Sequence, residues 1–202
     1  MISLVIDTAV SNLFLAIVKD NEVLSFVNKH VEKDLSAIIF NELDSIIKES
    51  SIDKTKIDNI LVAVGPGSFT GVRIGVTIAK TYAWALGIKA IPFSSLEFMC
   101  SGYDEDVVAL IDARRGYVFS GEYDNHLNCV SADQYVELSN IVSNDKKYVS
   151  FDKFDNVDTL EPIYDVLKIV SKHINDEGIN PHKLNPIYLK ATEAEEKLKE
   201  ND

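Results

Sequence analysis

Short hydrophobic runs at the start of the chain predict a β-hairpin. Residues 4–9 and 13–18 are rich in Leu, Val and Ile, which favour the buried, pleated backbone of a strand. The few residues between the runs suit a tight turn. The first run contains an acid, Asp7, and no basic segment precedes it. We therefore interpret the N-terminus as a strand and not as a signal peptide.

The same unit recurs in the second half of the chain. Residues 108–113 form an apolar run, residues 114–116 suit a turn, and residues 117–119 begin a second run. In both units an acid, Asp7 or Asp112, lies near the end of the first strand. A duplicated lobe would explain this repeat, and a chance similarity between two hydrophobic hairpins is the alternative.

Between the hairpins the hydrophobic period changes from that of a strand to that of a helix. Residues 34–50 and 70–86 are predicted to be helices, and residues 59–64 and 90–92 are predicted to be strands. Gly87 is expected to end the second helix, because glycine readily adopts the left-handed conformation common at that position. The order strand, helix, strand implies parallel pairing beside an antiparallel hairpin, which gives a mixed sheet.

The second half of the chain has a weaker pattern. Residues 136–142 are predicted to be a helix. Residues 161–174 are predicted to be another, with Pro162 in its first turn. The polar, acidic tail after Pro186 is also expected to be helical.

The length of 202 residues fits two lobes of about 100 residues each. We predict an α/β fold whose lobes are residues 1–100 and residues 101–202, each with a mixed sheet and helices, the second ending in the acidic tail.

The two helices of the first lobe have more apolar surface than a one-sided surface helix needs. On a helical wheel the first helix has an apolar stripe of Leu35, Ile38, Ile39, Leu43 and Ile46. Phe40 and Ile47 widen this apolar arc. The second helix is expected to bury Ile74, Ile78, Tyr82, Ala85 and Leu86.

The polar side of the second helix carries Trp84 among Arg73, Thr77, Lys80 and Thr81. Trp and Arg are enriched in protein interfaces, so we predict that both helices contact a partner or a second copy of the chain. Burial on two sides within its own fold, or a Trp lying flat on the surface, is the alternative. The predicted interface residues are Leu35, Ile39, Phe40, Leu43, Arg73, Thr77, Lys80 and Trp84.

A glycine-rich loop, residues 65–75 with the sequence GPGSFTGVRIG, joins a strand to the second helix. Free amides at a helix start suit an anion such as phosphate, but the glycine spacing matches neither common nucleotide fingerprint. The alternative is a packing corner, capped by Ser68 or Thr70, in which Gly71 and Gly75 let the helix lie close to the sheet. Both interpretations stay open here. The candidate residues of a vestigial nucleotide pocket are Asp7, Gly65, Gly67 and Ser68.

No set of residues in the sequence has the spacing of a catalytic or metal site. The histidines His30, His126, His173 and His182 lie scattered. Asp7 and Asp112 could hold a metal or orient a phosphate, but an acid at a hairpin entry more often accepts backbone hydrogen bonds. Ser94 and Ser95 have no neighbouring base in the sequence. We predict no catalytic residue, no metal site and no cofactor.

Composition narrows the possible partners. The net charge is −12, from 32 acids and 20 bases, and a chain of this charge repels the phosphates of nucleic acids. Any contact with RNA is therefore expected to be indirect. No apolar stretch approaches the roughly 20 residues that a membrane span needs. Cys100 and Cys129 lack the spacing of a redox or metal motif, which favours a reducing cytoplasm.

Four segments together resemble the bacterial TsaB (YeaZ) family: VIDTA, GPGSFTGVRIG, LIDARRGYVFSGEY and NPIYLKATEAEEKL. They occur in the family's order along nearly the whole chain, and the match is weakest over residues 126–181. The resemblance implies two ASKHA (RNase H-like) lobes, the class of actin and the sugar kinases, with a reduced second lobe. It also implies a role in making threonylcarbamoyladenosine at position 37 of transfer RNAs that read codons starting with A.

The resemblance implies further that the catalytic relative is TsaD, which binds its metal through an HMEGH motif. Here Ser95 and Met99 stand where the two metal-binding histidines would be, and neither can replace imidazole at a hard-cation site. The family forms its heterodimer with TsaD through the first two helices, and a small ATPase, TsaE, joins the complex. A homodimer through the same helices is plausible when TsaD is absent.

Two functional hypotheses follow. The first is a non-catalytic partner that activates TsaD. The second is an ASKHA-type enzyme that binds a nucleoside triphosphate with Asp7 and the loop from Gly65 to Gly71 and transfers a phosphoryl group. A metallopeptidase, an old label of the group, is disfavoured because paired histidines are absent from the sequence.

Overall fold

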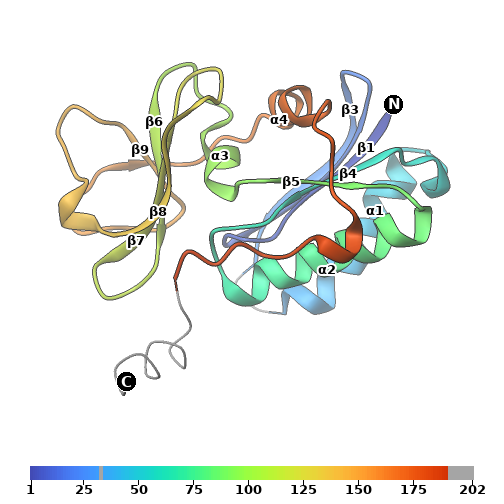
Figure 1. The fold of residues 1–202 in the computed structure, drawn as a ribbon, viewed down its shortest axis with the longest axis horizontal. Coiled ribbons are helices and arrows are strands. Elements are labelled where there is room, and N and C mark those ends of the chain that lie inside the picture. Colours follow the sequence, from blue (N-terminus) through green and yellow to red (C-terminus); the bar gives the residue numbers. More distant parts are fainter. Residues whose placement is uncertain (32–33, 191–202) are drawn as a thin grey trace.

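The predicted hairpin at the start of the chain forms, and it is the first part of a mixed sheet. β1 (Ile2–Asp7) pairs antiparallel with β2 (Asn12–Lys19), and β2 pairs with β3 (Glu22–His30). β4 (Asn59–Ala63) and β5 (Ala90–Phe93) lie parallel to β1 on its other side. The resulting order is β3-β2-β1-β4-β5 in this computed structural model, which describes residues 1–31 and 34–190 (Figure 1).

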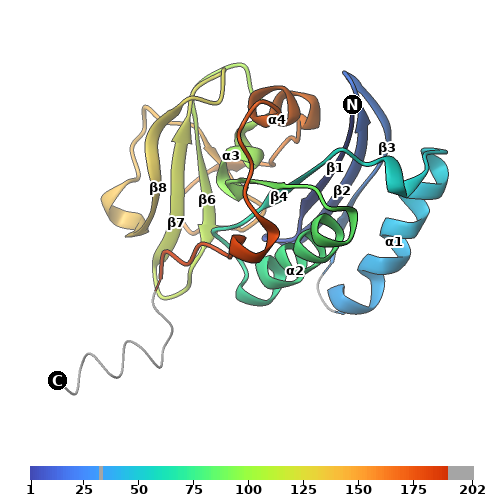
Figure 2. The ribbon, with the colours of Figure 1, turned by 45° about the vertical axis from the view of Figure 1, so that its right-hand side comes forward.

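Two helices cover one face of this sheet side by side: α1 (Leu35–Glu49) and α2 (Phe69–Leu86) (Figure 2). Both were predicted within one residue or two of their ends. Gly87 ends α2 with a φ of 69°, as predicted for a left-handed glycine. The core between helices and sheet contains aliphatic residues from all these elements, among them Leu4, Ile6, Leu15, Ile39, Leu43, Val62, Val76 and Ala79.

The second lobe repeats the arrangement of the first. Its strands are β6 (Val107–Asp112), β7 (Tyr117–Tyr123), β8 (Cys129–Glu137), β9 (Tyr148–Val149) and β10 (Thr159–Leu160), in the order β10-β9-β6-β7-β8. β6 and β7 are antiparallel and β9 is parallel to β6, as β1, β2 and β4 are in the first lobe. The predicted α/β fold with two mixed sheets is therefore confirmed. The second lobe contains no helix comparable with α1 or α2 in its described residues.

The first helix predicted for the second half does not form. Residues 136–142 are not an α-helix: Val136 pairs with Val118 in the sheet, and only the short 3-10 helix η2 (Leu138–Asn140) follows. The cross-strand pairing outweighs a local helical pattern that spans only two turns.

The second helix of this half, α4 (Val166–His173), begins five residues later than predicted, and Asp165 caps its N-terminus. Pro162 lies outside it, in a segment that is joined to the residues after α3 by the hydrogen bond from the Gly102 amide to the Ile163 carbonyl. In the predicted tail helix, residues 187–190 are not helical, and residues 191–202 lie outside the described part.

The two lobes share one core. The face of the first sheet opposite α1 and α2 packs against α3 (Ser95–Cys100), α4 and the inner face of β6. After α4 the chain returns across the first lobe: Ile179 forms a β-bridge with Ala90, and Leu184, just after the 3-10 helix η3 (Pro181–Lys183), is fully buried. Residues that follow position 100 therefore complete the first lobe.

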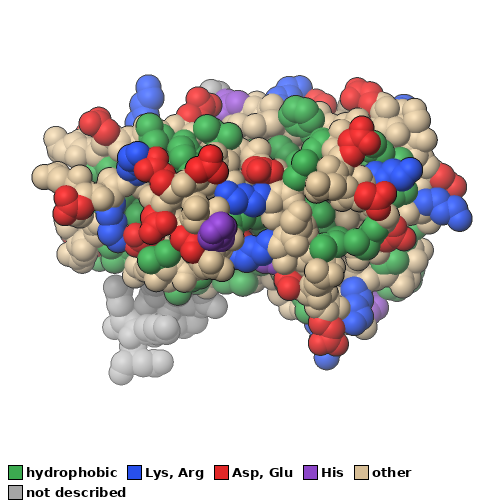
Figure 3. Space-filling model, turned by 90° about the horizontal axis from the view of Figure 1, so that it is seen from above, with side chains coloured by type: hydrophobic (Ala, Val, Ile, Leu, Met, Phe, Trp, Pro, Cys, Tyr) green, Lys and Arg blue, Asp and Glu red, His purple; other side chains and the backbone are tan. Residues whose placement is uncertain are grey.

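The charged side chains on the surface agree with the acidic composition of the chain. Seen from the side on which α4 lies, acidic and basic side chains are interspersed without a continuous basic area (Figure 3). Among the residues that the structure describes, no helix is both long enough and apolar enough to cross a lipid bilayer. The remaining short element is the 3-10 helix η1 (Lys54–Lys56), between α1 and β4.

Candidate functional site

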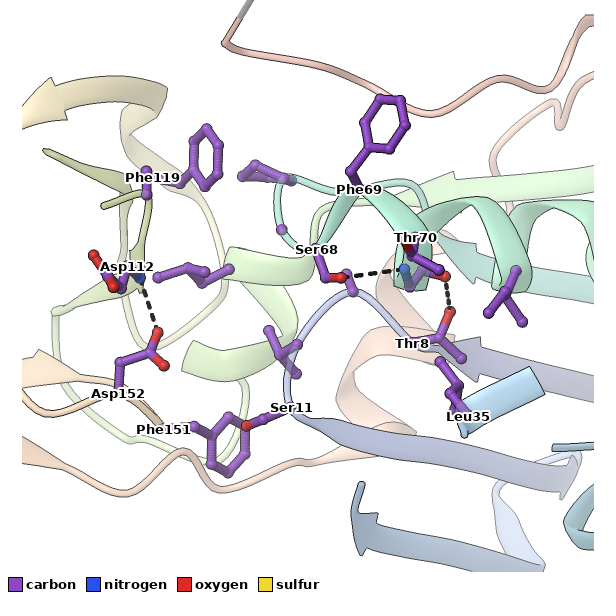
Figure 4. Close-up of a pocket in the computed structure, with 18 of the residues that line it drawn as sticks. Thr8, Ser11, Leu35, Ser68, Phe69, Thr70, Asp112, Phe119, Phe151 and Asp152 are labelled. Carbon is purple, nitrogen blue, oxygen red and sulfur yellow. Dashed lines mark hydrogen bonds between the residues drawn. The ribbon is translucent and has the colours of Figure 1, made fainter. Parts of the chain in front are cut away.

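A cleft of about 1100 Å³ lies between the two lobes. Its walls are the β1–β2 turn, the glycine-rich loop with the first turn of α2, the end of β6, and residues 187–190 (Figure 4). Asp112 and Asp152 line it from the second lobe, and Thr8 and Ser68 line it from the first. This is where the sequence hypothesis of an ASKHA-type enzyme would place its chemistry.

The glycine-rich loop fits tightly against the β1–β2 turn. A Cβ on Gly71 would lie 2.0 Å from the carbonyl oxygen of Thr8, and one on Gly67 would lie 2.2 Å from that of Ala9. A Cβ on Gly75 would lie 2.4 Å from the Thr8 hydroxyl oxygen. These distances are shorter than any nonbonded contact, so only glycine allows this approach. The loop is the packing corner that one of the two sequence interpretations described.

Amides of the loop bind the protein itself. The Ser68 amide donates to the Ala9 carbonyl at 2.7 Å, and the Gly71 amide donates to the Ser68 hydroxyl at 3.2 Å. The Thr8 hydroxyl donates to the Gly71 carbonyl at 2.7 Å (Figure 4). Ser68 is therefore the helix cap, one of the two residues considered for this role, and the Ser68 and Gly71 amides are not available to an anion.

The C-terminal segment covers the other side of the loop. The Ile187 amide donates to the Val64 carbonyl at 2.8 Å. A Cβ on Gly65, whose φ is 105°, would lie 3.0 Å from the Ile187 carbonyl oxygen. The sequence gives no local sign of this role. Residues 187–190 reach the loop only through contacts with residues that are far away in the sequence.

The carboxylates of Asp7 and Asp112 each accept a hydrogen bond from a backbone amide in the turn that follows. Asp7 Oδ1 accepts the Ala9 amide at 2.8 Å, and Asp112 Oδ1 accepts the Arg114 amide at 2.8 Å. The Asp112 amide in turn donates to Asp152 at 2.8 Å. Asp112 is exposed, whereas Asp7 is fully buried, and its Oδ2 has no hydrogen-bond partner among the described residues. Burial raises the pKa of Asp7 to about 7, although the Ala9 amide acts in the opposite direction.

The two residues that the family resemblance aligned with metal-binding histidines are buried. Ser95 and Met99 lie on α3 and are fully inaccessible to solvent, and Met99 lines the cleft. The Ser95 amide donates to the Gly65 carbonyl at 3.1 Å. Across the described ranges no group of three His, Cys, Asp or Glu residues is arranged to hold a metal ion.

A charge network around the buried Glu97, at the junction of the lobes, was not predicted from the sequence. Glu97 on α3 accepts from Lys172 at 2.6 Å and from His173 at 2.9 Å, and His173 also contacts Asp176. Burial alone would raise the pKa of Glu97, but the hydrogen bonds and charges of His173 and Lys172 hold it below its usual value. Lys172 also donates to the Leu127 carbonyl in the second lobe. The network ties α4 to α3 and to the second sheet.

Exposed aromatic side chains stand out on the outer side of α1 and α2. Phe40 is 58% exposed and Trp84 is 66% exposed. Of the other predicted interface residues, Arg73 and Thr77 are exposed, and Leu35 and Lys80 are partly buried.

Two predicted interface residues do not lie on this surface. Ile39 and Leu43 are 0% and 1% exposed, because they pack on the protein's own sheet. The buried face of α2 also differs from the prediction: it consists of Gly71, Val72, Gly75, Val76, Ile78, Ala79 and Ala83. Ala85 is exposed. The glycines turn this face toward the sheet, since a helix packs most closely where side chains are smallest.

Comparison with known proteins agrees with this architecture. A family model described as TsaD, tRNA N6-adenosine threonylcarbamoyltransferase, matches residues 25–159. The tRNA threonylcarbamoyladenosine biosynthesis protein TsaB of Bacillus subtilis is 36% identical over 145 residues, which cover 69% of this chain and 63% of that protein. The protein of the same name from Escherichia coli is 35% identical over 62% of this chain and 56% of its own length. The chain thus spans less than two thirds of these curated relatives.

A solved structure shows the same fold. A crystal structure from Pseudomonas aeruginosa, described as an uncharacterized protein with similarity to peptidase YEAZ, superposes with a TM-score of 0.81 at 19% identity. The superposition covers 94% of this chain and 99% of that one. At this identity the likeness establishes the fold and not the activity.

Proposed function

This chain belongs to the TsaB (YeaZ) family, and on that premise we propose that it is a non-catalytic partner of TsaD. In this role it activates TsaD in forming N6-threonylcarbamoyladenosine at position 37 of transfer RNAs that read codons starting with A. Transfer RNA meets this chain only through the complex, TsaE joins the assembly, and the complex works in the cytoplasm. Without TsaD, the same surface can pair with a second copy.

The observation that carries the proposal is the exposure of Phe40 and Trp84 on neighbouring helices. Large aromatic side chains exposed among polar neighbours are typical of binding surfaces. The side chains lie on α1 and α2, which cover one face of the sheet together (Figure 2). A partner helix pair could bury both aromatic residues at once.

The hydrogen bonds of the glycine-rich loop weigh against the phosphotransferase hypothesis. The Ser68 amide is bonded to the Ala9 carbonyl and the Gly71 amide to the Ser68 hydroxyl. A phosphate would have to displace these two contacts before it could bind either amide. Calorimetry of the isolated chain with ATP and magnesium tests the point. Binding with turnover would contradict the proposal, and absence of heat together with binding to TsaD would support it.

The decisive experiment is a reconstituted modification assay. Purified TsaD, TsaE and the enzyme that supplies the threonylcarbamoyl group are incubated with transfer RNA, with or without this chain, and the modified nucleoside is measured. We expect modification only when the chain is present. Equal modification in its absence would overturn the proposed role.

A further inference from the structure

One side of α2 is aromatic at both ends and positively charged between them. We define the α2 stripe as Phe69, Arg73, Thr77, Lys80 and Trp84, which follow one another at intervals of three or four residues and therefore share one side of the helix. The helix contains no acidic residue, although the whole chain has a net charge of −12. At about 1.5 Å per residue, the two aromatic ends lie about 22 Å apart.

Arg73 is held in place before any partner binds. Its guanidinium carbon lies 3.8 Å from the centroid of the Phe69 ring, and its Nε donates to the Tyr188 hydroxyl at 2.7 Å. The rings of Phe69 and Tyr188 stack on each other with centroids 5.0 Å apart. Because Tyr188 follows Ile187, which is bound to the Val64 carbonyl, the C-terminal segment anchors the whole group.

The remaining donors of Arg73 are available. Within residues 1–31 and 34–190, Nε is the donor of this side chain that makes a hydrogen bond, and no ion pair neutralises the group. Phe69 and Tyr188 beside it are 44% and 45% exposed. A planar guanidinium with two free terminal nitrogens matches the geometry of a carboxylate. Since its orientation is already fixed, little side-chain entropy is lost on binding.

We propose that Arg73 binds a carboxylate of the protein that covers the α2 stripe, so that the contacting surface is acidic between two apolar sites. Trp84 and the Phe69–Tyr188 pair enter the two apolar sites, and Lys80 contributes a second attraction. This inference rests on the proposed function, because it describes the chemistry of the same surface. It also assigns Tyr188 a role as a positioning residue for Arg73.

Charge favours a protein carboxylate over the other occupants. An RNA backbone would need more than two cations for appreciable affinity, and the acidic chain as a whole repels it. A second copy of the chain, paired through α2 about a two-fold axis, would bring like charges together, so such a homodimer should be weaker than a complex with an acidic partner surface.

The experiment measures the affinity of the full chain for TsaD of the same organism at low and high salt. Arg73→Glu should weaken binding by roughly tenfold or more. Arg73→Lys, which keeps the charge but loses the planar fork, and Tyr188→Phe, which keeps the ring but loses the acceptor, should lie in between. The control Lys153→Glu makes the same charge change at an exposed position of the second lobe and should bind as the wild type does. Thermal unfolding checks that each variant is folded.

The outcomes separate the two proposals. If the wild-type chain does not bind TsaD, both proposals are overturned. If it binds and Arg73→Glu binds equally well, only the role of Arg73 is overturned. Loss of transfer RNA binding by Arg73→Glu with unchanged affinity for TsaD would assign the group to RNA and contradict the inference. A matching acid on TsaD, found by a Lys substitution that restores binding of Arg73→Glu, would support it directly.

Discussion

Thr8 makes the contacts against which the glycine-rich loop packs. Its carbonyl oxygen faces Gly71, its hydroxyl oxygen faces Gly75, and its hydroxyl donates to the Gly71 carbonyl. The spacing of the two glycines, one helical turn apart, therefore reflects a single residue of the β1–β2 turn, which meets Gly71 with its backbone and Gly75 with its side chain. Spacing alone could not distinguish this packing from an anion site, because both need glycine at a helix start.

Replacing Gly71 by Ala should destabilise the fold. The new methyl group would lie 2.0 Å from the Thr8 carbonyl oxygen, which belongs to rigid backbone, so α2 must move away from β1. The expected cost is about 1–3 kcal/mol, measured by urea denaturation. Thr77→Ala, an exposed substitution on the same helix, is the control and should be nearly neutral. Equal stability of the two variants would show that the loop relaxes freely.

The buried carboxyl of Asp7 should make stability depend on pH. Its pKa is about 7 in the folded chain against 3.8 for the ordinary group, so between these values the folded state binds the additional proton. Stability from this group is full below the lower value and is lost as the pH rises through the higher one. At about 1.4 kcal/mol per pKa unit, the total effect is a few kcal/mol.

Asp7→Asn, which cannot ionise, should remove this slope. Urea denaturation across the same pH range measures it, and Asp112→Asn, at an exposed carboxyl, is the control that should keep the wild-type slope. An unchanged slope in Asp7→Asn would mean that another group is responsible.

At the scale of elements, helical periodicity located α1 and α2 within one residue or two of their ends. It assigned most of their core-facing residues correctly, among them Ile46 and Ile78, but not all of them. Ile39 and Leu43 were predicted at an interface and lie in the core, whereas Ala85 was predicted to be buried and is exposed. A wheel gives the apolar arc of a helix, but the sheet beneath decides which part of the arc is covered.

The exposed part of that arc should bind a partner. Trp84→Ala and Phe40→Asp should both weaken association with TsaD in a pull-down, and loss of Phe40 should cost about 2 kcal/mol or more. Neither variant should unfold, because both side chains are largely exposed.

Phe26→Asp is a matched control for this prediction. Phe26 is 60% exposed on β3, and its ring stacks on Phe14, which faces away from α1 and α2. If Phe26→Asp weakens association as much as Phe40→Asp does, the assignment of the surface to α1 and α2 is wrong.

At the scale of the whole molecule, the two lobes depend on each other. α4 follows the second sheet in sequence yet packs on the first, and Leu184 enters the core beneath α2. The buried carboxylate of Glu97 joins the same regions through its ion pairs with Lys172 and His173. The two sheets have corresponding strand orders, yet each lobe packs against residues from the other half of the chain.

A fragment ending at residue 100 should not fold cooperatively. It would expose the apolar face that α4 and β6 cover and would lack Leu184, so the loss of buried area would outweigh the chain entropy saved. Near-ultraviolet circular dichroism and urea denaturation measure this against the full chain, which should unfold in one transition. A sharp transition in the fragment would establish residues 1–100 as an independent domain.

The sequence by itself determined the elements whose signals are local. Alternating or periodic hydrophobic runs set the two hairpins and the two long helices, Gly87 set a helix end, and the net charge set the disfavoured partners. Their information lies within a few residues of the chain, where backbone preference and side-chain spacing act directly.

Tertiary structure decided everything that depends on contacts across the sequence. Val136 is in a strand because Val118 pairs with it. The glycine-rich loop needs its glycines because Thr8 and Ile187 lie against it. Arg73 is oriented because Tyr188 contacts it. The physical reason is that a buried contact gains its free energy from both partners, and one segment of sequence shows only one of them.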